Sequence, residues 1–233
     1  MSEKFMSKLL VDSNTAMSNS NYIATSGIAT NIKIIKNMKK MIVLFIIFFV
    51  SFNLYAKNME NPKILIVYYS WSGNTKTMAN EIKSIAGGDM FEIVPVEPYP
   101  DDYKMCIEQA KGEIKRNFRP KIIGEVKDFS KYDIIFVGSP NWWGTIAPPV
   151  ATFLTQYNFS DKTIVPFCTH GGGGKQKVFT DMIKMLPTSK VLKGLEVYCK
   201  YEGGLPVMGG SSYKSKDAVE KWIKELNILQ IKK

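Results

Sequence analysis

Hydrophobic and polar positions follow two alternating periods from Pro62 onward. Short runs of apolar and β-branched residues alternate with longer stretches whose apolar residues share one helical face. The short runs predict strands over 63–69, 90–96, 133–138, 162–168 and 191–199. The longer stretches predict helices over 75–85, 102–117, 147–157, 176–186 and 215–226. In the second of these helices, Met105, Ile107, Ala110 and Ile114 are expected to face the core.

Regular alternation of strands and helices predicts an α/β fold with one parallel sheet covered on both faces. The first strand is apolar along nearly its whole length, as a strand buried on both faces should be. We find no internal repeat or long linker after residue 62, so we interpret residues 57–233 as one domain. In such sheets, ligands bind beyond the carboxyl ends of the strands, where the strand order reverses.

The segment before residue 57 follows neither period. Residues 1–37 are rich in Ser, Asn, Thr and Met, and we expect them to be disordered or an artefact of the assigned start codon. Residues 38–56 have a basic start, a short apolar run and a final Ala56, which is typical of a signal peptide. An uncleaved membrane anchor is the alternative, although the run is short for a span.

This N-terminal pattern leads to two expectations about location. If the leader is used, the protein is exported or periplasmic, and it contacts a membrane only where the segment stays uncleaved. If translation starts near Met59, the product is cytoplasmic and has no leader.

Composition narrows the classes of function. Hydrophobic residues make up 45% of the 233 residues and charged residues 22%, which excludes a disordered chain. Three cysteines without a C-x-x-C spacing and a single histidine predict no metal site. The net charge is +10, but no Lys/Arg block or nucleic-acid motif occurs, so nucleic acid is not an expected partner. Six of the 31 basic and two of the 21 acidic residues precede residue 57, which leaves the domain at about +6.

The loop after the first strand carries the clearest chemical signal, because it runs directly into a helix. Its hydroxyls, its glycine and the amides at the helix start suit a terminal phosphate. It matches neither G-x-x-x-x-G-K-[ST] nor G-x-G-x-x-G, and an ordinary helix cap is the alternative. The candidate residues are Ser70, Trp71, Ser72, Gly73, Asn74 and Thr75.

Two further loops follow the third and fourth strands, at the same edge of the sheet. The first carries paired tryptophans and a glycine, and the second carries the only histidine before a run of four glycines. The candidate residues are Pro140, Asn141, Trp142, Trp143, Gly144, Thr169, His170, Gly171 and Gly172.

These three loops, in this order on these strands, resemble the flavodoxin family, in particular its short flavodoxin-like members. The segment Tyr99–Tyr103 is also similar to that subgroup, and the resemblance covers about residues 62–228. It implies a flavodoxin-like three-layer sandwich with a five-stranded parallel sheet in the order 2-1-3-4-5. It also implies non-covalent FMN and transfer of one or two electrons.

The resemblance also implies roles for single residues. One of the paired tryptophans should touch the flavin ring, with Trp142 favoured, unless both only anchor the next helix. Gly144 should let the backbone move near the ring. The glycine run should bring amides to the pyrimidine edge, unless it is a hinge. No catalytic residue is assigned, but His170 is a candidate to donate to a flavin carbonyl or relay a proton, unless it is merely solvated.

Three functions stay open from the sequence. The first is an FMN-binding redox protein that serves a partner protein or a small-molecule electron acceptor. The second is an NAD(P)H-dependent quinone or small-molecule reductase, and the third is a non-redox binding module of the same fold. The basic charge departs from acidic flavodoxins, so we expect Lys76 and Lys175, beside the predicted loops, to favour an anionic reduced flavin.

Overall fold

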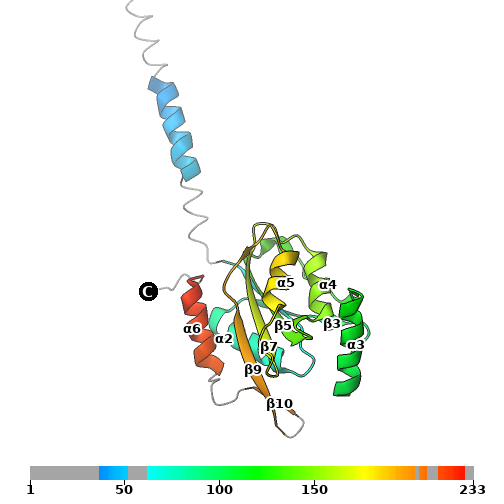
Figure 1. Ribbon diagram of the computed structural model, residues 1–233. Coiled ribbons are helices and arrows are strands. Elements are labelled where there is room, and N and C mark those ends of the chain that lie inside the picture. The colour runs from blue at the N-terminus through cyan, green and yellow to red at the C-terminus, as the bar shows by residue number, and fades with distance from the viewer. Residues whose placement is uncertain (1–36, 52–61, 203–204, 209–214, 229–233) are drawn as a thin grey trace, which may run out of the picture. The chain divides into compact units, whose positions relative to one another are not determined.

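A computed structural model of the chain describes residues 37–51, 62–202, 205–208 and 215–228 (Figure 1). The chain divides into two compact units, Met1–Glu60 and Asn61–Lys233.

In the first unit, residues 37–51 form a helix whose large apolar side chains are exposed. None of the helices in the described ranges is both long enough and apolar enough to cross a membrane. The signal peptide or anchor predicted over residues 38–56 therefore gains no support here. Its end at 52–56, and the extension at 1–36, lie outside the described residues. Export stays a prediction, which cell fractionation and the mass of the mature chain would test.

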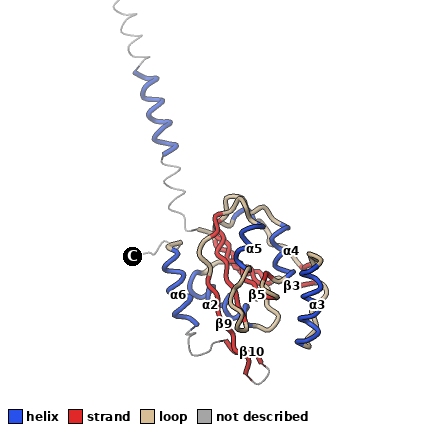
Figure 2. Tube along the Cα trace, in the orientation of Figure 1, coloured by secondary structure: helices blue, strands red, loops and turns tan. Residues whose placement is uncertain are grey.

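The second unit is built on a central sheet whose parallel strands run in the predicted order. The strands are β1 (Ile64–Tyr68), β2 (Asp89–Glu92), β5 (Ile134–Trp142), β7 (Thr163–His170) and β9 (Leu195–Glu202). They lie in the order β2-β1-β5-β7-β9, each parallel to its neighbour. In chain order this is 2-1-3-4-5, which confirms the predicted flavodoxin-like arrangement and places the reversal between β1 and β5. Figure 2 shows the strands in red and the helices in blue.

The sheet also contains strands that the sequence did not predict, so it is mixed rather than purely parallel. Strand β10 (Leu205–Met208) adds to β9 in the antiparallel sense. The short strands β6 (Thr145–Ile146) and β8 (Lys190–Val191) pair with β5 and β7. The predicted strand 90–96 is broken at Ile93, and β3 (Val94–Pro95) pairs instead with β4 (Ile122–Ile123). Pro95 lacks the amide that a central ladder requires.

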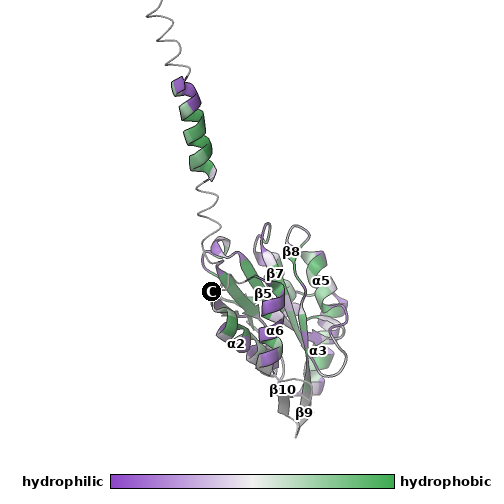
Figure 3. Ribbon diagram, turned by 90° about the vertical axis from the view of Figure 1, so that its left-hand side faces the viewer, coloured by the Kyte–Doolittle hydropathy of each residue, from purple (hydrophilic) through white to green (hydrophobic). Residues whose placement is uncertain are grey.

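Helices cover both faces of this sheet. Helices α2 (Asn74–Ala86) and α6 (Ser215–Leu226) pack on one face. Helices α3 (Tyr103–Lys115), α4 (Pro148–Gln156) and α5 (Val178–Met185) pack on the other, and a 3₁₀ turn occupies Phe129–Lys131. The hydrophobic strands lie between these layers (Figure 3).

Strand β1 shows why this architecture follows from the sequence. Successive side chains of a strand point to opposite faces. Ile64, Ile66 and Tyr68 join the cluster under α2 and α6, whereas Leu65 and Val67 join the cluster under α3, α4 and α5. Because both faces are covered, every position has to be apolar, and the chain leaves the sheet where the first polar residues appear.

Candidate functional site

A pocket of about 1290 Å³ lies at the carboxyl ends of β1, β5 and β7. It brings together most residues of the three predicted loops. Those that line it are Ser70, Trp71, Ser72, Asn74, Thr75, Pro140, Asn141, Trp142, Trp143, Thr169, His170 and Gly171. Gly73, Gly144 and Gly172 were predicted with them but are not among the lining residues.

Helix α2 begins at this pocket without a capping side chain. Its N-cap residue is Gly73, in the left-handed conformation with φ = 86°, and no side chain bonds to the first-turn amides. The hydroxyl of Thr77 instead donates to the Gly73 carbonyl at 3.1 Å. The alternative of an ordinary Ser/Asn/Thr cap is therefore wrong, and the amides at the positive end of the helix dipole are left for an anion.

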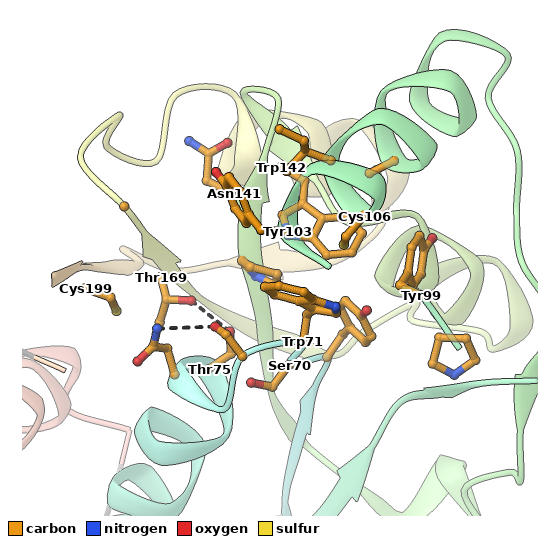
Figure 4. A pocket seen from close by; sticks show the side chains of 18 of the residues that line it. Ser70, Trp71, Thr75, Tyr99, Tyr103, Cys106, Asn141, Trp142, Thr169 and Cys199 are labelled. Atoms are coloured by element: carbon orange, nitrogen blue, oxygen red, sulfur yellow. Dashed lines mark hydrogen bonds between the residues drawn. The ribbon is translucent and has the colours of Figure 1, made fainter. Parts of the chain in front are cut away.

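The hydroxyls around these amides differ in their bonding. Thr75 is buried, and its Oγ1 lies 2.8 Å from Oγ1 of Thr169, so one bond joins the start of α2 to the end of β7 (Figure 4). Asn74 Nδ2 donates to Ser72 Oγ at 3.3 Å. Ser70 Oγ is also buried, but it has no hydrogen-bond partner among the described residues.

An aromatic wall faces the hydroxyls across the pocket. The Trp142 ring packs edge-on against Tyr69 and Tyr99, with centroids 5.4 and 4.8 Å away. Trp71 Nε1 donates to the Pro100 carbonyl at 3.0 Å, and its ring lies 6.2 Å from that of Tyr103. Trp142 and Trp71 are thus fixed by packing, which gives the pocket flat, rigid walls.

Trp143 is held in a different way. It has a positive φ of 52° and is followed by Gly144 at φ = 82°, so the two form the tight turn that joins β5 to β6. Trp143 Nε1 donates to the Ile107 carbonyl of α3 at 2.8 Å, and half of the residue is exposed. Gly144 suits this turn because its positive φ is one that other residues rarely adopt, and movement of its backbone near a ligand stays a prediction. Which tryptophan touches a ligand stays a prediction.

The glycine run at the end of β7 is ordered by His170. Its Nδ1 accepts hydrogen bonds from the amides of Gly172 and Gly174, at 3.2 and 3.1 Å. These two amides point to the imidazole, so they are not free to reach a ligand. The glycine run, for which a flexible hinge was one interpretation, is therefore held in place by hydrogen bonds. His170 is not simply solvated, because it accepts both of these bonds. Burial lowers the His170 pKa below its ordinary value.

Comparisons with known proteins agree with this geometry. The family model described as flavodoxin matches residues 63–226. The chain belongs to the flavodoxin family. The interpretation as a flavodoxin-like flavoprotein is thereby confirmed.

Individual relatives of this flavodoxin-family chain include enzymes and solved flavoproteins. A protein named NAD(P)H dehydrogenase (quinone) from Azorhizobium caulinodans is 28% identical over 167 residues, which is 65% of this chain and 80% of that protein. A protein described as a flavoprotein from Bacteroides eggerthii is 26% identical, with TM-score 0.60 over 72% of this chain and 99% of that one. A Lactobacillus acidophilus flavoprotein, solved with FMN, is 32% identical, with TM-score 0.52 over 58% and 92%.

This flavodoxin-family chain has a second side to its pocket that the sequence did not predict. It is formed by the segment between β2 and α3 and by α3 itself. The additional lining residues include Ile93, Val94, Pro95, Pro98, Tyr99, Tyr103, Cys106, Ile107 and Ala110. Figure 4 shows Tyr99 and Cys106 on the opposite side of Ser70 and Trp71 from the Thr75–Thr169 pair. The pocket is therefore mainly polar at α2 and mainly apolar at α3.

A buried carboxylate supports this second side. Glu113 of α3 is 3% exposed, and it accepts hydrogen bonds from the Tyr99 hydroxyl and from Gln109 Nε2. None of the described residues forms a salt bridge with it. Burial and then Glu113 raise the pKa of the neighbouring Cys106 thiol to about 11, so the thiol stays protonated at neutral pH. Of the residues predicted to face the core, Ala110 is buried but Met105 is exposed, and the buried Cys106 and Glu113 were not predicted.

We expect Tyr99→Phe to lower the free energy of unfolding by about 2 kcal/mol, because it leaves a buried carboxylate short of a donor. Urea unfolding would measure the loss. In a Glu113→Gln background the loss should shrink, since the acceptor there carries no charge. An equal loss in both backgrounds would contradict the role given to the carboxylate.

The lysines beside the predicted loops do not provide unbalanced charge. Lys76 pairs with Glu92 at 2.7 Å, and Lys175 pairs with Glu196 at 2.9 Å. Glu92, Asp101 and Asp102 line the pocket, which has no lysine or arginine among its described lining residues. The expectation that these two lysines favour an anionic ligand is therefore weakened, although the domain as a whole is basic.

Proposed function

We propose that the pocket binds FMN and that the protein transfers electrons through this non-covalent cofactor. One observation carries the proposal. Among the described residues, Ser70 Oγ is the one buried side-chain oxygen or nitrogen without a hydrogen-bond partner, and Ser70 lines the pocket beside the uncapped start of α2. A buried hydroxyl without a partner is costly, and a phosphate oxygen would supply the acceptor.

The lining residues together fit both the phosphate and the ring of such a ligand. The hydroxyls of Ser70, Ser72 and Thr75, with the amides at the α2 start, would hold the phosphate without a lysine or arginine. Trp71 and Trp142 offer flat apolar surfaces for the ring. When bound, FMN supplies one- or two-electron redox chemistry. The Lactobacillus acidophilus relative, solved in complex with FMN, supports the choice of this flavin.

The test is titration of the purified, flavin-free chain with FMN and with riboflavin, followed by visible absorbance and fluorescence. We expect FMN to bind about a hundred-fold more tightly, because only FMN carries the phosphate. Equal binding of the two would refute the phosphate site. Absence of any flavin binding would refute the proposal and favour the non-redox binding module.

A second candidate is an NAD(P)H-dependent quinone reductase, which would use the same flavin. The relatives of that name favour it. The size of the pocket also favours it, because about 1290 Å³ exceeds the range of about 300–1000 Å³ that is typical for a single small ligand. Steady oxidation of NADPH by the FMN-loaded chain with a soluble quinone, in the absence of any partner protein, would select this function. Reduction that requires a partner protein would select the electron carrier.

A further inference from the structure

We infer that His170 is a positioning residue, whose neutral imidazole holds the glycine loop 171–174 at the rim of the pocket and releases it on taking up a proton. The inference rests on the proposed flavin site only for its binding readout. We call this hold of the imidazole on the glycine loop the clamp, and it is a property of the ligand-free chain.

The clamp depends on one nitrogen atom. Nδ1 of His170 accepts from the Gly172 amide at 3.2 Å and from the Gly174 amide at 3.1 Å. An imidazole nitrogen accepts hydrogen bonds only through its lone pair, so Nδ1 carries no proton and the ring proton is on Nε2. Protonation of Nδ1 turns the acceptor into a donor that faces two other donors. Both bonds are then lost together.

The loop is tied to the rest of the pocket at the same place. Asn141 Nδ2 donates to the Gly174 carbonyl, and Asn141 Oδ1 accepts from the Gly144 amide at 2.8 Å. Asn141 thus joins the glycine loop to the turn that carries Trp143. Because His170, Gly171 and Asn141 all line the pocket, release of the loop changes the pocket wall directly.

The charges around the imidazole oppose one another. From β9, Glu196 Oε2 lies 3.8 Å from His170 Nε2, and the Tyr198 ring lies 5.9 Å away. After the loop, Lys175 binds Glu196 through both its amide and its Nζ, which balances much of the carboxylate charge. The nearby Cys199 thiol has a pKa raised to about 11 by burial, so it is uncharged.

These surroundings set the direction of the pH dependence. Burial lowers the His170 pKa, Lys175 lowers it further, and Glu196 opposes them, with a net shift below the ordinary value of 6.5. A histidine with a lowered pKa is neutral in the folded protein above that value, so the clamp is complete at pH 7 to 8. It is lost as the pH falls below about 6.5 and through the lowered pKa.

The first test uses the ligand-free chain, in which His170 is the only histidine. In a chain labelled with ¹⁵N at histidine, NMR observes the two ring nitrogens of a single imidazole. At pH 8 we expect an unprotonated Nδ1 and a protonated Nε2. The amide signals of Gly172 and Gly174 should shift with the same midpoint as the imidazole. A proton on Nδ1 at pH 8, or glycine amides that do not follow the titration, would overturn the inference whether or not flavin binds.

The second test measures FMN affinity from pH 5 to 8 in three chains. In His170→Asn, the side-chain oxygen can take the place of Nδ1 as an acceptor but does not titrate, so it should rescue binding to within about three-fold at pH 8. His170→Ala should bind about ten-fold more weakly at pH 8, since both bonds are lost. The wild type should approach the alanine variant as the pH falls.

The asparagine variant also controls for the titration of the ligand itself. The phosphate of FMN changes charge near pH 6, so some pH dependence is common to all three chains. Only the difference between wild type and His170→Asn reports the imidazole. Identical pH profiles for these two chains, or an alanine variant with wild-type affinity at pH 8, would overturn the inference. If no chain binds FMN, the proposed function fails, and the NMR titration still decides about the clamp.

Discussion

Gly138→Ala is expected to destabilise the protein by about 3 kcal/mol, because the new methyl group has no room. A Cβ at Gly138 would lie 2.2 and 2.3 Å from two atoms of the Phe167 ring. That ring is fully buried in the neighbouring strand β7 and is paired in register with Gly138, so it cannot move aside cheaply. Thermal unfolding should show a midpoint lower by roughly 6–12 °C for a domain of this size.

A matched control is Gly112→Ala, near the C-terminal end of α3. There the nearest atom to the new Cβ is Arg116 Nη1 at 3.4 Å, which is an ordinary contact with a flexible side chain. Alanine is the better helix former, so this variant should be more stable by about 0.5–1 kcal/mol. The packing argument would fail if both variants changed the midpoint in the same direction by similar amounts.

The strands around Gly138 show which part of the fold can be predicted from the sequence. The buried strands were predictable because a parallel strand covered on both faces is apolar throughout. The ends of the strands were not predictable, because polar residues continue the hydrogen-bonded strand pairing there. Pro140 pairs with Thr169, and β5 extends to Trp142 before it turns back into β6. The predicted loop is therefore partly strand, and Asn141 and Trp142 are positioned more rigidly than a loop would hold them.

The site was predictable only where the chemistry is local. Adjacent hydroxyls and a glycine before a helix were enough to predict the α2 side of the pocket from six neighbouring residues. The α3 side depends on contacts between distant segments. Met105 was expected to be inward but is 63% exposed, whereas Cys106 and Glu113 are buried. From sequence alone a glutamate is expected at the surface. The hydrogen bonds that Glu113 accepts from Tyr99 and Gln109 become apparent only in the structure.

The glycine run shows the same limit. Four consecutive glycines indicate a backbone with wide freedom, which fits both a flexible hinge and a close approach to a ligand. The flexible hinge does not describe the loop that forms, because His170 holds two of its amides, whereas a close approach of the other glycines to a ligand stays a prediction. The amides of Gly172 and Gly174 point to the imidazole two and four residues before them, a geometry set by the end of β7 and not by composition.

Ser70→Ala is expected to weaken FMN binding about ten- to hundred-fold, which corresponds to about 1.5–3 kcal/mol for a hydrogen bond to a charged oxygen. The same change should leave the ligand-free protein at least as stable as the wild type, because it removes a buried hydroxyl that has no partner among the described residues. Opposite signs for affinity and stability distinguish a ligand-binding hydroxyl from a structural one. Thr75 does not allow this separation, since its hydroxyl also bonds to Thr169.

The experiment compares FMN and riboflavin affinity, and thermal stability without ligand, for three chains. Thr77→Ala is the matched control, because its hydroxyl lies in the first turn of α2 but bonds to the Gly73 carbonyl, and Thr77 does not line the pocket. It should leave FMN affinity unchanged. Riboflavin has no phosphate, so its weak binding should be insensitive to Ser70→Ala. If FMN and riboflavin lost affinity equally, Ser70 would act on the shape of the pocket, and the assignment of the α2 start as the phosphate site would be wrong.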